Sequence, residues 1–137
     1  ADTISPDINS DVKTLANYKL QYEALKKKLN EFPDTKFIIW TPTALAEKAT
    51  NIDEAKRANE FSDWVKNVWD TKDDNILLWD FRSLQVEEGY FFKNSFCKSE
   101  VDSHPNQDFA ESVVPYFCNR IVKVIEGKGD VTSITGK

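Results

Sequence analysis

The chain has 137 residues, which suits a single domain, and we expect one over 1–137, with an entering loop at 1–10 and a polar tail at 128–137. Its net charge of −5 and its lack of a basic cluster interleaved with aromatic residues argue against a nucleic-acid-binding protein. No apolar run approaches the roughly 20 residues that a helix needs to cross a bilayer, so we expect no membrane span.

A helix and a strand are predicted first along the chain. Apolar residues spaced three and four apart indicate a helix that begins near Ser10 or Asp11 and is stopped by Pro33. The stretch TKFIIWT, residues 35–41, is short, β-branched and aromatic. It predicts a strand that is buried on both faces, as in a parallel sheet.

The remaining elements continue this alternation. A second helix is predicted over 53–69, and NILLWDF, residues 75–81, predicts a second buried strand. A long connection over 82–105 precedes a last helix that starts near Asn106 and ends at Gly127.

This order predicts an α/β fold with two parallel strands and three helices, joined by right-handed crossovers. Two strands alone would leave both edges of the sheet open and could not cover three helices. Either the rest of the sheet lies elsewhere or residues 82–105 supply further strands. We favour the first and expect the chain to be the C-terminal part of a larger doubly wound domain.

The two cysteines, Cys97 and Cys118, lack CxxC spacing and are too few for a metal site. A disulfide between them would close a loop of about 20 residues, and two buried thiols are an equal alternative. The compartment, secreted or cytoplasmic, therefore stays open.

The stretch VDSHPNQDF, residues 101–109, contains the only histidine of the chain, His104. It follows the second predicted strand and precedes a helix, and sites of doubly wound sheets lie beyond the carboxyl ends of the strands. An imidazole can act as a general base at neutral pH, and a carboxylate such as Asp102 can fix its tautomer. The alternatives are a surface histidine and an acid that caps a loop.

Three blocks, PDTKFIIWTP, NILLWDF and DSHPNQDFAESVVPYF, resemble the C-terminal half of the SGNH (GDSL-type) serine esterase family. The resemblance covers about residues 8–126. It implies a three-layer α/β/α, flavodoxin-like fold and ester hydrolysis that needs neither metal nor cofactor. It also implies that His104 is the histidine that deprotonates a catalytic serine, while Asn106 has only a capping role.

The catalytic acid departs from the family pattern. The family's acid usually lies three residues before the histidine, where this chain has Val101. We expect Asp102 to take this role through a shifted loop, with Glu100 as a weaker candidate. A backbone carbonyl that orients the ring of His104 is a further alternative.

The nucleophile and the oxyanion hole are missing from the chain. Ser10, Ser83 and Ser95 lie in no G-D-S or G-x-S-x-G context, and there is no G-x-N-D block. Because acyl transfer needs a nucleophile, a base and oxyanion donors together, we expect a missing N-terminal segment or a companion chain to supply them. The substrate would be a small acyl ester or an acetylated carbohydrate, and residues 41–42 and 90–92 would shape its acyl pocket unless those aromatics are core.

A non-catalytic module that binds a partner or a glycan is the main alternative. Such a module would cover its open sheet edge by forming a homo-oligomer or by pairing with another chain. The four tryptophans are a conceivable carbohydrate platform, although their spacing on helices and strands favours core packing. A flavodoxin-like ligand-binding domain fits less well, because the four glycines form no phosphate loop.

Overall fold

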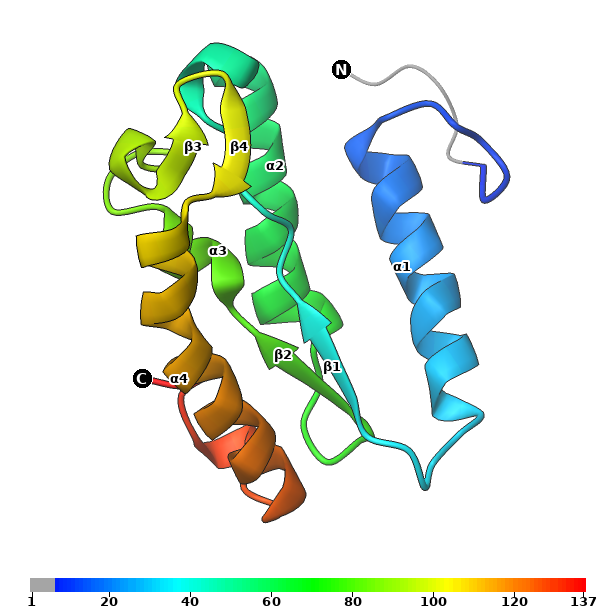
Figure 1. Ribbon diagram of the computed structural model, residues 1–137. Coiled ribbons are helices and arrows are strands. Elements are labelled where there is room, and N and C mark those ends of the chain that lie inside the picture. The colour runs from blue at the N-terminus through cyan, green and yellow to red at the C-terminus, as the bar shows by residue number, and fades with distance from the viewer. Residues whose placement is uncertain (1–6) are drawn as a thin grey trace.

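The computed structural model describes residues 7–137, and within them the protein is a mixed α/β structure with four α-helices and two small sheets (Figure 1). The main elements are, in chain order, α1 (Leu15–Asn30), β1 (Phe37–Trp40), α2 (Ile52–Trp64), a π-helical turn η2 (Val65–Trp69), β2 (Ile76–Trp79), α3 (Phe81–Gln85), β3 (Cys97–Ser99), β4 (Asp102–Pro105) and α4 (Gln107–Ile125). Short 3-10 turns occupy η1 (Glu47–Ala49), η3 (Asn94–Phe96) and η4 (Gly129–Val131).

The two predicted strands form the parallel pair β1–β2, with Phe37 opposite Ile76 and Trp40 opposite Trp79. Burial on both faces is correct for β2, whose four residues are all buried. It is wrong for β1, which is only partly buried, and the side chain of Trp40 remains 44% exposed. The reason is that β1 is hydrogen-bonded to a strand on one side only in the described part of the chain.

The C-terminal segment, residues 128–137, packs against the end of β2. The backbone N–H of Asp80 donates to the carbonyl of Ile134 at 2.8 Å, and the indole N–H of Trp79 donates to the carbonyl of Thr135 at 3.0 Å. Part of this segment is buried: the hydroxyl of Thr132 accepts from the buried guanidinium of Arg120 at 3.3 Å. Of the predicted entering loop, residues 1–6 lie outside the described residues.

Helices cover both faces of the parallel pair. On one face, α1 and α2 pack over Ile76 and Leu78, and the indole N–H of Trp69 donates to the carbonyl of Tyr22 at 2.8 Å. On the other face, α4 packs over Trp79 through residues that include Phe109. Consecutive residues of β2 therefore serve opposite cores, as the alternation of a strand requires.

The structure has one α-helix more than the three predicted, and residues 82–105 do contain strands, which was the less favoured alternative. A fourth helix, α3, overlaps the start of this stretch, and β3 and β4 form an antiparallel pair near its end. The first helix begins later than expected, because Thr14 rather than Ser10 or Asp11 caps it: its hydroxyl accepts from the N–H of Asn17 at 3.1 Å. The cap of α4 is the predicted Asn106.

Both cysteines are free thiols, with Cys97 buried and Cys118 exposed on α4. Trp69 and Trp79 are core residues, whereas Trp40 and Trp64 are partly exposed. Across residues 7–137, no helix is long and apolar enough to cross a membrane.

Candidate functional site

His104 lies on strand β4, not in the loop that the sequence predicted, and Asp102 lies two residues before it on the same strand. Because side chains alternate along a strand, residues two apart point to the same side. Atom Oδ1 of Asp102 is 2.5 Å from Nδ1 of His104, and it also accepts the backbone N–H of His104 at 2.9 Å. The carboxylate therefore fixes both the ring and the backbone of the histidine.

Neighbouring hydrogen bonds hold β4 in place. The hydroxyl of Ser99 on β3 accepts the backbone N–H of Asp102 at 3.1 Å. The hydroxyl of Ser103 accepts the N–H of Ala46, in the segment after β1, at 2.9 Å. The strand that carries the histidine is thereby tied to the end of the parallel pair.

The pair faces a hollow beside the carboxyl ends of β1 and β2. Its lining comes from three places: the segment after β1, the start and end of α3, and residues 101–105. Thr43 and Leu45 belong to the segment after β1, and Phe81 and Gln85 are the first and last residues of α3. Asp102 and His104 thus lie in the region where parallel sheets place their ligands.

Hydrogen bonds from His104, first from its backbone N–H and then from its ring, lower the pKa of Asp102 below its ordinary value. The carboxylate is therefore ionised at neutral pH and accepts a proton-bearing Nδ1. In the neutral ring this leaves the lone pair of Nε2 free. The His104 side chain is 79% exposed, and no group of the described chain hydrogen-bonds to Nε2.

The other candidate acid, Glu100, and the hydroxyl of Ser83 do not contact this pair. Glu100 forms an ion pair with Lys48, and this contact lowers its pKa. The hydroxyl of Ser83 donates to Oδ2 of Asp80 at 2.5 Å, so it is committed elsewhere. In the described residues the site thus consists of the Asp102–His104 pair, with no serine hydroxyl hydrogen-bonded to the ring of His104.

Three buried charged residues, Asp80, Arg82 and Arg120, were not recognised from the sequence, and Arg82 lies nearest to the segment after β1. Arg82 directly follows the first residue of α3 and is only 3% exposed. Its backbone N–H donates to the hydroxyl of Thr41 at 3.0 Å, and this hydroxyl donates to Asp80 Oδ1 at 3.0 Å. In the sequence, Arg82 directly follows the predicted strand NILLWDF. An exposed loop arginine is ordinary at such a position, so little in the sequence indicates that Arg82 is buried.

Between residues 7 and 137, no three or more His, Cys, Asp or Glu side chains form a group that could hold a metal ion.

A comparison of the chain with models of known families found no match, and comparisons with curated proteins and with solved structures found none either.

Proposed function

We propose that this chain is the acid–base half of a serine ester hydrolase of the SGNH type. His104 is the general base, and Asp102 is the residue that orients it. The observation that supports this most is the 2.5 Å contact between Asp102 Oδ1 and His104 Nδ1, at the carboxyl ends of a parallel strand pair. A free Nε2 atom beside such a strand end is what a base needs to meet a serine hydroxyl.

The reaction follows from the chemistry of this pair. Nε2 of His104 takes the proton of a serine hydroxyl as its oxygen attacks the ester carbonyl, and then gives that proton to the leaving alcohol. In the second half, Nε2 takes a proton from water, which attacks the acyl-enzyme, and the proton returns to the serine. Asp102 stabilises the imidazolium in both halves by accepting from Nδ1.

The strand geometry supports Asp102 in spite of its spacing. Residues two apart on an extended strand share one side, so an acid two positions before the histidine reaches Nδ1 directly. An acid three positions before the histidine would need a loop conformation to bring its carboxylate to Nδ1. Val101, at that position, has no carboxylate and is exposed.

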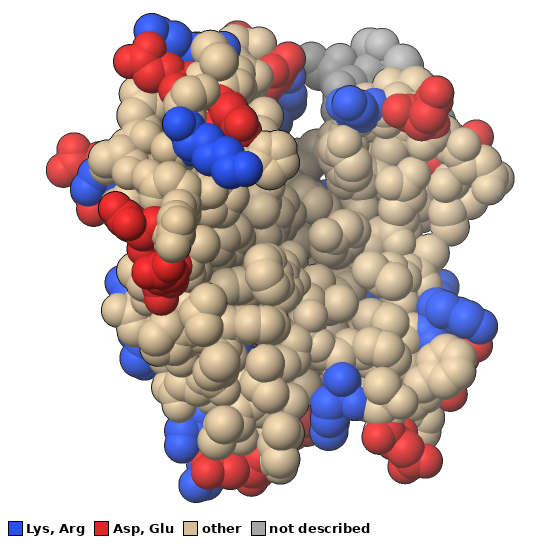
Figure 2. Space-filling view, viewed as in Figure 1, with Lys and Arg blue, Asp and Glu red and all other residues tan. Residues whose placement is uncertain are grey.

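The serine and the oxyanion donors come from outside these 137 residues, by our proposal from a preceding segment or a companion chain. The free edge of β1 is the place where that part joins and extends the sheet into the three-layer α/β/α arrangement of the family. Support comes from Trp40, a large apolar side chain that is 44% exposed at this edge. Figure 2 shows charged side chains around this face and few at its centre, which suits an area that becomes covered.

Labelling with a fluorophosphonate ester tests the proposal on the protein made from its complete coding sequence, with the companion chain added if there is one. We expect the probe on a serine outside residues 1–137, with labelling lost in His104→Ala and kept in the exposed control Glu111→Gln. Folding of each variant is checked by circular dichroism. Labelling that persists in His104→Ala contradicts the proposal.

The second candidate is a non-catalytic binding module. It is favoured by the lack of any serine hydrogen-bonded to His104 within the described residues, together with the unpaired edge of β1. The two candidates differ in one outcome, since a binding module shows no fluorophosphonate labelling in its complete form.

A further inference from the structure

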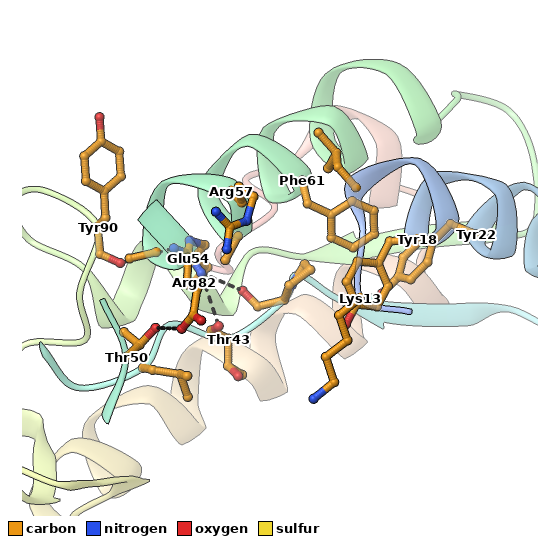
Figure 3. Close-up of a pocket in the computed structure, with 15 residues that line it drawn as sticks. Lys13, Tyr18, Tyr22, Thr43, Thr50, Glu54, Arg57, Phe61, Arg82 and Tyr90 are labelled. Carbon is orange, nitrogen blue, oxygen red and sulfur yellow. Dashed lines mark hydrogen bonds between the residues drawn. The ribbon is translucent and has the colours of Figure 1, made fainter. Parts of the chain in front are cut away.

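A second cavity lies between α1, α2 and the segment that follows β1, and it has a volume of about 560 Å³ (Figure 3). This size is in the range of small-molecule sites, roughly 300–1,000 Å³. One wall is aromatic: the ring of Phe61 lies 5.5 Å from that of Tyr18 and 4.9 Å from that of Tyr22, measured between centroids. An aromatic wall of this kind suits the apolar body of a ligand.

The buried guanidinium of Arg82 lies at the opposite side of this cavity (Figure 3). Its Nη1 atom donates to the carbonyls of Pro42 at 3.4 Å and Thr43 at 3.2 Å, and Nη2 donates to the carbonyl of Tyr90 at 3.2 Å. Nε is buried and has no acceptor among the described residues. Nε therefore keeps an unused hydrogen-bond donor next to the cavity.

The charge of Arg82 is held without a direct counter-ion. In the described residues no carboxylate oxygen lies within 4 Å of its guanidinium, and its three acceptors are neutral carbonyls. Burial lowers the pKa of Arg82, and the more distant Asp63 and Asp80 oppose this effect. Because a buried cation without an ion partner is costly, an anion beside Arg82 would be strongly favoured.

The remaining charges of the cavity lining are mainly positive. Arg57 on α2 and Lys13 before α1 contribute two further cations, and neither forms an ion pair within 4 Å in the described chain. Glu54 is the one carboxylate of the lining, and it accepts from the hydroxyl of Thr50 at 2.9 Å. Three cations and one carboxylate give the lining an excess of positive charge, which favours an anionic ligand.

We propose that this cavity binds a small organic carboxylate. The carboxylate is attracted by the uncompensated charge of Arg82, Arg57 adds a second positive charge, and the apolar body of the ligand packs on Phe61 and Tyr18. This site is separate from the proposed hydrolase function and does not require it. Thr43 and Leu45 line both this cavity and the hollow of His104, so the two sites are neighbours.

An NMR titration of the chain with octanoate tests the proposal. Octanamide, which has the same length and no charge, and inorganic phosphate, which has no apolar body, are the matched probes. We expect octanoate to shift the amide signals of the cavity lining in a saturable way, and octanamide to bind about ten-fold more weakly or worse. Equal affinity for octanamide, saturable shifts by phosphate at the same residues, or shifts confined to other residues overturn the proposal.

Variants of α2 identify the cavity without removing Arg82, whose loss would release three backbone carbonyls. Ala58→Trp fills the space beside Phe61, and we expect it to weaken octanoate binding about ten-fold or more. Arg57→Gln should weaken it about three-fold or more, while Lys56→Gln, with the same change of charge on the same helix but outside the lining, should leave it unchanged. Unchanged binding by folded Ala58→Trp, or equal losses in Arg57→Gln and Lys56→Gln, contradict the proposed site.

Discussion

Asp102 and His104 occupy alternate positions of strand β4, and this places Oδ1 of the carboxylate 2.5 Å from Nδ1 of the imidazole. Although Asp102 lies only two residues before His104, its carboxylate reaches the imidazole directly. It also determines which nitrogen of the ring is free. The carboxylate accepts from Nδ1, so Nε2 is the atom that faces solvent and any incoming hydroxyl.

The tautomer of His104 is the first prediction. With Asp102 ionised, the neutral ring should carry its proton on Nδ1, and Asp102→Asn should shift the population toward the Nε2-protonated form that dominates in free histidine. Nitrogen chemical shifts of the ring, measured at pH 8, report the tautomer directly. Because His104 is the only histidine of the chain, the signals need no assignment.

A matched control for this measurement is Asp108→Asn, an acid in the first turn of α4 that makes no hydrogen bond to the ring. It should leave the tautomer unchanged. If Asp102→Asn has the same ring nitrogen shifts as the parent chain, Asp102 does not orient the histidine.

The fold was predictable where a local pattern decided the structure. The apolar run NILLWDF predicted a buried strand, and all four residues of β2 are buried. Asn106 was predicted as a helix cap, and its side-chain oxygen accepts the N–H of Phe109 at 2.9 Å. The packing of the C-terminal segment on β2 was not predictable. It depends on backbone contacts between Ile134 and Asp80, far apart in sequence, and backbone contacts leave no side-chain pattern.

The docking of this C-terminal segment gives the second prediction. Gly136 has a φ of +80°, and a Cβ atom there would collide with the backbone oxygen of Tyr116. Gly136→Ala should therefore lower the free energy of unfolding by roughly 2 kcal/mol or more, since it adds a clash to the strain. Thermal and denaturant unfolding measure the loss.

Gly127→Ala separates strain from clash. Gly127 has a φ of +73°, but a Cβ atom there meets nothing within 4 Å. It should cost only about 1 kcal/mol. Equal losses in the two variants would show that the contact with Tyr116 does not matter for stability.

Asp70 supplies a third prediction, on the pH dependence of stability. Burial, followed by the charges of Asp74 and Asp130, raises its pKa from 3.8 to about 6, although Lys26 and Arg120 act in the opposite direction. A raised pKa in the folded state means that the folded protein binds more protons than the unfolded one between pH 4 and pH 6. Stability should therefore fall as pH rises through this window and should level off above it.

Replacement of the carboxylate removes this effect. Asp70→Asn should raise the free energy of unfolding at pH 7 by on the order of 1 kcal/mol, a value reduced for solvent screening of a half-buried group. At pH 3, where the aspartate is protonated, the two proteins should be similar. Melting temperatures at both pH values test this. Asp73→Asn, at an exposed neighbour, is the control, and an equal gain in that variant would contradict the role of Asp70.

The free edge of β1 leads to a fourth prediction. The N–H groups of Phe37 and Thr41 donate to the carbonyls of Asn75 and Trp79, on the β2 side. The alternate N–H groups of Ile38 and Trp40 therefore point to the other edge of β1. We expect the amides of Ile38 and Trp40 to exchange with deuterium faster than those of Phe37 and Thr41. Equal protection of all four would mean that this edge is already covered in the chain alone.

The candidate site was predictable only in part. His104 and Asp102 stand close together in the sequence, so their partnership could be inferred from a short motif. The role of Arg82 could not, because its acceptors are backbone carbonyls from residues on both sides of it in the chain, including Pro42 and Tyr90. The position of those carbonyls depends on the tertiary fold and not on any residue type.

The esterase rate of the complete protein is the most direct test of His104 as a base. With p-nitrophenyl acetate as substrate, we expect kcat to fall by about 10⁴-fold in His104→Ala and to stay within about two-fold in Glu111→Gln. Since both residues are exposed, the two variants should fold equally well. A complete protein whose esterase rate is the same with and without His104 would contradict the proposed function.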